Sequence, residues 1–80
     1  MNRVLVGRVY KHFKGDSYIV LNIATDCETL KPVVVYQALY DYGKIYVRDK
    51  EDFLSKVDTV KYPNVEQKYK FELQKIKSVR

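Results

Sequence analysis

The sequence predicts a mainly β domain, a small and partly open antiparallel barrel of about five strands with one short helix. Eighty residues suffice for one apolar core, near the lower size at which such a core holds a chain folded. Short runs rich in β-branched and aromatic residues alternate with polar turns, and helical spacing is clear only after Arg48. We expect a single domain over 1–80, with its core at about 7–74 and a frayed tail at 75–80.

The first two strands are expected on either side of a turn. A strand at about 7–13 ends where Lys14-Gly15-Asp16 signals a turn, and a second begins at Ser17 with the dense β-forming run YIVLNIA. Polar residues over 25–31 then indicate a loop, and Pro32 stands where a strand can begin.

The stretch 31–48 predicts a β-hairpin whose faces differ chemically. Its turn contains Gly43, which suits a left-handed position because only glycine takes positive φ without steric cost. A bulged turn would place Tyr36 opposite Arg48, whereas a two-residue turn would slip the register by one and mix the faces. One face, predicted to be the core side, is then Val33, Val35, Leu39, Ile45 and Val47; the other is Tyr36, Ala38, Tyr40, Lys44, Tyr46 and Arg48.

After the hairpin, Asp49 can cap a short helix over about 50–57. The last part reads two ways, as a helix over 65–76 or as a strand over 68–74, and the strict alternation of the latter favours the strand, with lysines guarding a sheet edge. Five strands and one helical turn close most simply into an SH3-like barrel, an antiparallel sheet under a covering helix being the alternative.

Several short strings occur together in order: His12-Phe13-Lys14-Gly15, Glu28-Thr29, Val34-Val35-Tyr36, Leu39-Tyr40 and Tyr46-Val47-Arg48. This pattern resembles the small bacterial domain-of-unknown-function family 1653 over about residues 7–73. The resemblance implies an SH3-like barrel and no activity. Asp26 stands where the family pattern usually has His, Lys31 where it often has an acid, Tyr46 where it has Trp and Asp49 where it has Pro. A site built on that His would therefore be incomplete here, although Glu28 is kept.

Charge and cysteine content limit the setting. The net charge is +5, and the excess lies in the second half of the chain, which suits a solvated domain about as well as a polyanion binder. The single Cys27 excludes an intrachain disulfide and suggests a reducing, cytoplasmic setting. No apolar run approaches the roughly 18 residues of a membrane span.

The hairpin's aromatic face is the leading candidate for contact with a ligand, because tyrosines beside a cation suit stacked or charged partners. Equally, the helix carrying Phe53 would cover this face as a second core layer. His12 serves either a site or, as we favour, a strand-end hydrogen bond, and the Asp26–Thr29 loop can close on itself. The candidate ligand-binding residues are Tyr36, Tyr40, Tyr46, Arg48, His12 and Glu28.

These features favour a non-enzymatic binding module for a protein or a small ligand. The alternative is a nucleic-acid-binding barrel that uses the same face with nearby lysines on phosphates. An enzyme ranks third, since the sequence has no glycine-rich phosphate loop, no metal-ligand spacing and no nucleophile beside a base. We expect no catalytic residue, cofactor or metal.

Overall fold

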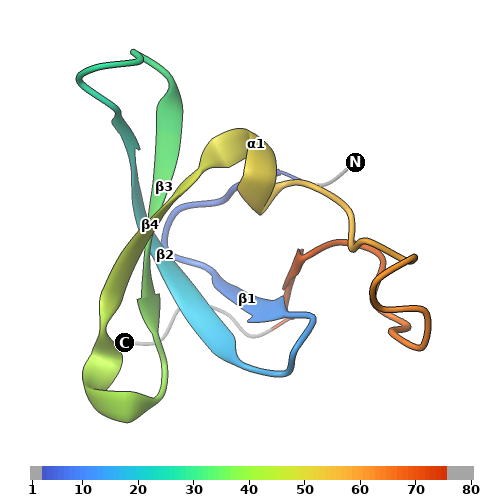
Figure 1. Ribbon diagram of the computed structural model, residues 1–80. Coiled ribbons are helices and arrows are strands. Elements are labelled where there is room, and N and C mark those ends of the chain that lie inside the picture. The colour runs from blue at the N-terminus through green and yellow to red at the C-terminus, as the bar shows by residue number, and fades with distance from the viewer. Residues whose placement is uncertain (1–2, 76–80) are drawn as a thin grey trace.

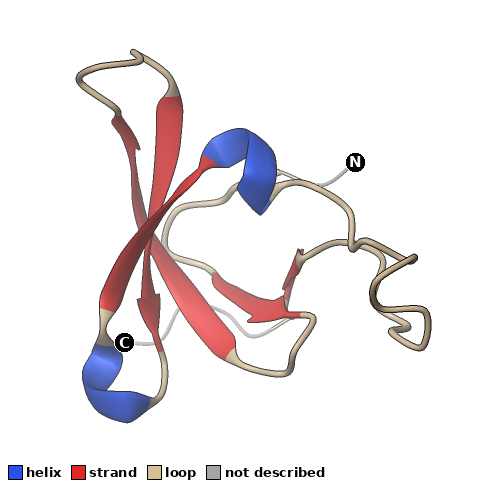
Figure 2. Ribbon diagram, in the orientation of Figure 1, coloured by secondary structure: helices blue, strands red, loops and turns tan. Residues whose placement is uncertain are grey.

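The computed structural model describes residues 3–75, which form one antiparallel sheet of five strands in the order β4-β3-β2-β1-β5 (Figures 1 and 2). The mainly β class is thereby confirmed. The elements are β1 (Val9–His12), β2 (Ser17–Thr25), β3 (Pro32–Ala38), the 3-10 turn η1 (Asp41–Gly43), β4 (Ile45–Asp49), α1 (Lys50–Phe53) and β5 (Phe71–Leu73).

One cluster of buried side chains holds the sheet and α1 together. Phe53 from α1 and Phe71 from β5 stack with their ring centroids 4.2 Å apart and their planes 7° apart. Tyr10 of β1 meets Phe53 edge-on at 5.4 Å, a favoured geometry because ring edges and faces carry opposite partial charge. The cluster comprises Tyr10, Val20, Val34, Tyr36, Phe53 and Phe71.

The two ends of the sheet are linked through irregular chain. Beyond α1, Val57 donates its N–H to the carbonyl of Lys68 at 2.9 Å, and Lys70 donates to that of Ser55 at 3.0 Å. Since α1 follows β4 directly and residue 70 leads into β5, these bonds connect the β4 end of the sheet to the β5 end. The sheet therefore curls around its core, and these few backbone bonds join its β4 and β5 ends.

The predicted register of the hairpin was wrong by two residues. Tyr36 lies opposite Tyr46, where the prediction placed it opposite Arg48. The turn is longer than expected, because Ala38 donates its N–H to the carbonyl of Lys44, and the three residues of η1 all have positive φ. The positive φ predicted for Gly43 is confirmed, at 64°. A shift of two leaves the membership of the two faces unchanged, because side chains alternate with a period of two.

The side of the hairpin that faces the core was predicted the wrong way round. Val47 is 67% exposed and Ile45 59%, whereas Tyr36 is only 4% exposed. The physical reason is the position of Phe53 and Phe71, which pack against the tyrosine side. Alternation separates two faces, but the later elements decide which one is covered.

The helix and the last strand are both shorter than predicted. Helix α1 stops at Phe53, and Asp49 at its N-cap makes no side-chain capping bond. The strand chosen over 68–74 is confirmed in type but is regular only over Phe71–Leu73. Before it, the carboxylate of Glu72 accepts N–H bonds from Lys68 and Tyr69 at 3.0 Å each, which replaces ladder pairing. Of the tail expected at 75–80, residues 76–80 lie outside the described residues.

Within residues 3–75, no helix has the length and apolar character needed to cross a membrane.

Candidate functional site: a basic cleft beside the covered tyrosine face

The tyrosine face of the hairpin is largely a core layer. Tyr36 packs edge-on against Phe53 and Phe71 at centroid distances of 5.6 and 5.5 Å. The hydroxyls of Tyr40 and Tyr18 hydrogen-bond at 2.6 Å, and burial together with this bond raises the pKa of Tyr18. Tyr46 alone of the three predicted tyrosines remains exposed, at 39%. The sequence allowed this face to be either a ligand-contact surface or a core layer covered by the helix that carries Phe53, and in the structure it is covered.

His12 and Glu28 lie at opposite ends of β2. The Nδ1 atom of His12 accepts the N–H of Lys14 at 3.1 Å, the strand-end bond that the sequence favoured. Glu28 is exposed in the β2–β3 loop, where Asp26 accepts the N–H groups of Glu28 and Thr29 at 2.8 and 3.2 Å. These two backbone bonds lower the pKa of Asp26. The nine residues of β2 separate the two candidates (Figure 1), so they form no joint site.

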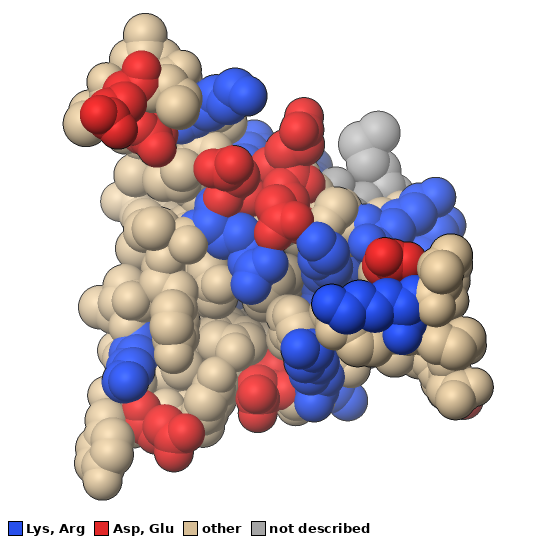
Figure 3. Space-filling view, in the orientation of Figure 1, with Lys and Arg blue, Asp and Glu red and all other residues tan. Residues whose placement is uncertain are grey.

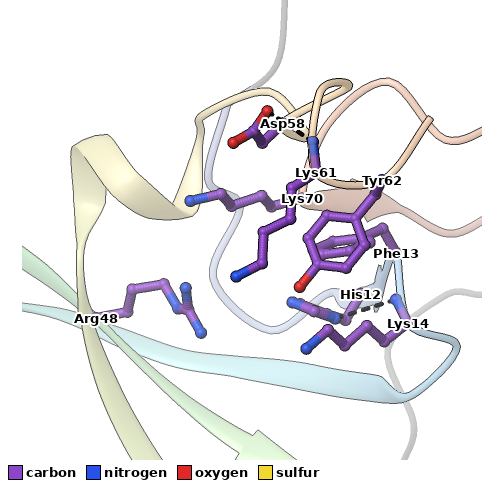
Figure 4. A pocket seen from close by; sticks show the side chains of 8 residues that line it. All are labelled: His12, Phe13, Lys14, Arg48, Asp58, Lys61, Tyr62 and Lys70. Atoms are coloured by element: carbon purple, nitrogen blue, oxygen red, sulfur yellow. Dashed lines mark hydrogen bonds between the residues drawn. The ribbon is translucent and has the colours of Figure 1, made fainter. Parts of the chain in front are cut away.

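The structure instead brings basic side chains together at a cleft. Its volume is about 330 Å³, and it lies between the β1–β2 turn, β4 and the chain leading into β5 (Figure 4). Figure 3 shows Lys and Arg side chains gathered on this part of the surface, between α1 and the β1–β2 turn. The lining consists of His12, Phe13, Lys14, Arg48, Asp58, Lys61, Tyr62 and Lys70.

Asp52 of α1 holds two of the cations in place. Its carboxylate accepts hydrogen bonds from Nη1 of Arg48 at 2.6 Å and from Nζ of Lys70 at 2.7 Å. Arg48 is fixed further, since its Nε donates to the Tyr36 hydroxyl at 3.1 Å and its guanidinium lies 5.1 Å from the centre of the Phe71 ring. The bond from Lys70 lowers the pKa of Asp52 most, partial burial acts against it, and the bond from Arg48 adds to the lowering. Asp52 is therefore ionised at neutral pH and pre-orders this wall.

The opposite wall is aromatic with two further cations. Tyr62 meets Phe13 edge-on at 4.9 Å. The ammonium groups of Lys14 and Lys61 lie 5.6 and 5.5 Å from the centre of the Tyr62 ring, within the range of a cation–π contact. Within residues 3–75, the ion pairs are those of Asp52 with Arg48 and Lys70, which lie on the wall opposite these rings.

His12 supplies a neutral donor at the cleft. Burial, followed by the nearby charges of Arg48 and Lys14, lowers its pKa below the ordinary value, so the imidazole is uncharged at neutral pH. Because Nδ1 accepts the Lys14 N–H, the remaining proton sits on Nε2. In Figure 4 that side of the ring faces the cleft.

Asp58 is the one acid in the lining. Its Oδ1 accepts the N–H groups of Val60 and Lys61 at 3.0 and 3.2 Å, which engages it in its own turn. Four lining cations against Asp52 and Asp58 leave an excess of two positive charges. Among residues 3–75 there is no group of three or more His, Cys, Asp or Glu side chains that could hold a metal ion.

Of the residues that line the cleft, only His12 and Arg48 are among the candidate ligand-binding residues predicted from the sequence. Lys14 lies far along the chain from Lys61 and Lys70, and no short motif joins the latter two. The one available signal was the basic excess of the second half of the sequence.

A family model described as a protein of unknown function, DUF1653, matches residues 8–73. The chain belongs to the DUF1653 family. The matched region runs from β1 through β5 and includes all eight residues that line the cleft. No curated protein and no solved structure matches the chain.

Proposed function

We propose that this DUF1653 protein is a small non-enzymatic binding module that holds an anionic ligand in the basic cleft. The observation that carries the proposal is the convergence of four cations on one cleft, two of them fixed in advance by Asp52. Ordering side chains before binding lowers the entropy cost of forming the complex.

The geometry favours binding over catalysis. Every cationic group and the Nε2 of His12 offer hydrogen-bond donors, and the single imidazole of the chain is engaged at Nδ1 by the Lys14 backbone. A nucleophile activated by that imidazole would need Nδ1 or Nε2 as an acceptor. With Nδ1 occupied and the proton on Nε2, the arrangement suits a receptor for an acceptor-rich ligand.

The proposed module retains part of the surface expected from the sequence. Arg48 lies on the tyrosine face and also lines the cleft, whereas Tyr36 beside it supports the guanidinium from within the core. The partner is then an anionic small ligand, or a protein that presents an anionic group. The curled sheet and the bonds between 55–57 and 68–70 support an SH3-like barrel as the fold type. The single exposed Cys27 supports a cytoplasmic setting.

Isothermal titration calorimetry with citrate, inorganic phosphate and tripolyphosphate tests the proposal. At least one of these anions should bind, and Lys61→Ala should weaken that binding about fivefold or more, a coupling of roughly 1 kcal/mol. Lys44→Ala is the matched control, because it removes the same charge from the exposed hairpin, outside the cleft. Equal weakening by both variants would indicate attraction to net charge alone and would refute the cleft as the site.

The rival function is nucleic-acid binding at the same cations. A fluorescent single-stranded oligonucleotide would then bind with a log-log salt slope of about −0.7 for each phosphate engaged. We expect binding weaker than about 10 μM at physiological salt, within the non-specific range. Submicromolar affinity abolished by both Arg48→Ala and Lys61→Ala would favour the nucleic-acid function instead.

A further inference from the structure

We infer that the ligand of the basic cleft is a phosphate monoester carrying a ring-shaped organic group, of the kind represented by a nucleoside 5′-monophosphate. This inference rests on the proposed function, since it names the chemical class of anion for the same site. Three features carry it: the distribution of donors over the walls, the charge balance, and the aromatic rings beside the cations.

Hydrogen-bond donors approach the cleft from three parts of the chain. Arg48 and Lys70 come from the wall that Asp52 orders. Lys14 and the Nε2–H of His12 come from the β1–β2 turn and the end of β1 that leads into it, and Lys61 comes from the segment before β5 (Figure 4). A phosphate monoester has three terminal oxygens directed to three sides, whereas a carboxylate presents two oxygens in one plane. Donors from three directions fit the former.

The charge balance matches a dianion. The cleft carries four cations opposed by Asp52 and Asp58, and a phosphate monoester carries about −1.5 to −2 at pH 7. A phosphodiester carries only one negative charge for each phosphate. The cleft is accordingly better matched to a terminal phosphate than to one within a diester.

The aromatic wall indicates that the phosphate bears an organic group. Phe13 and Tyr62 line the cleft together, and its volume of about 330 Å³ lies at the lower end of the range for small-molecule sites. That space exceeds the needs of a bare phosphate ion. A planar ring placed against Tyr62 would stack, and Asp58 in the lining offers an acceptor for a sugar hydroxyl.

Calorimetric titration with adenosine 5′-monophosphate, 3′,5′-cyclic AMP, adenosine and citrate tests the inference on the full chain. The 5′-monophosphate should bind at least tenfold more tightly than the cyclic diester, which keeps the same base and sugar with one charge fewer. Adenosine should show no saturable binding. Equal affinity for the monoester and the diester would overturn the charge argument.

Two cleft variants and one control variant separate failure of the inference from failure of the proposed function. Lys61→Ala should weaken the 5′-monophosphate about fivefold or more and Lys44→Ala less than twofold. Tyr62→Leu should weaken binding of the 5′-monophosphate more than binding of inorganic phosphate, because the ring also contacts Lys14 and Lys61; an equal loss of both would refute the organic group. Citrate that binds in a Lys61-dependent manner without the 5′-monophosphate would overturn the inference and leave the anion-binding function standing. Absence of any Lys61-dependent anion binding would refute both.

Discussion

Replacing one valine on each face of the hairpin shows which face is the core. Val34→Ala removes two methyl groups from a side chain that is completely buried in the main cluster. Loss of burial contributes about 1.6 kcal/mol, and the cavity left behind raises the cost to roughly 2 to 3 kcal/mol. Val47→Ala acts on a side chain that is 67% exposed. Its cost should be about 0.5 kcal/mol, from partial burial and lower β propensity.

The assay is chemical and thermal unfolding followed by far-ultraviolet circular dichroism or tyrosine fluorescence, which the eight tyrosines and absence of tryptophan allow. For a domain of this size, the expected loss for Val34→Ala corresponds to a drop in the thermal midpoint of roughly 10 to 20 °C. Val47→Ala should lower it by only about 2 to 4 °C. If Val47→Ala proves as costly as Val34→Ala, the outer face is covered in solution, and the assignment of the core to the tyrosine side is refuted.

Three further substitutions test the turn and the cleft. Gly43→Val should lower stability by about 1 to 2 kcal/mol, since φ is +64° and the new Cβ would lie 3.0 Å from Nε2 of Gln37; an unchanged thermal midpoint would contradict the left-handed turn. Asp52→Asn should cost about 1 kcal/mol or less at pH 7, because its ion pairs are partly exposed. The folded-state pKa of Asp52 is lowered, so the ionised carboxylate stabilises the folded protein above about pH 4. The difference in unfolding free energy between wild type and Asp52→Asn should therefore vanish on acidification below that pH. A difference that persists at lower pH would argue against an electrostatic origin. The folded-state pKa of His12 is also lowered, so the unfolded chain binds the proton more readily and wild-type stability should fall as pH drops below about 6.5. His12→Gln should flatten that dependence in urea titrations, and an identical slope in both proteins would count against it.

Local chemistry in the sequence determined where the elements lie. Dense β-branched residues after Ser17 and the proline at position 32 marked the starts of β2 and β3 as the structure has them. The alternation in 31–48 separated two faces, and Gly43 was placed correctly in the left-handed region. The ordered strings between His12 and Arg48 also indicated the family that the comparison finds. Each of these depends on residues close together in the chain, where propensity and steric rules operate.

The tertiary structure decided what depends on distant segments. The register of the hairpin is set by the hydrogen bond from the Ala38 N–H to the Lys44 carbonyl across a longer turn. Loops of different length preserve the same alternation of the strands, so the sequence pattern alone does not select one of them. The rings of Phe53 and Phe71 determine which face of the hairpin is buried, because they pack against the tyrosine side. Either the apolar or the aromatic face could have formed a core, and only one face of the hairpin is covered by other elements. The cleft required Lys14, Arg48, Lys61 and Lys70 to converge from separate elements. The sequence contains these cations, but the curvature of the sheet brings them to one site, where the carboxylate of Asp52 holds Arg48 and Lys70.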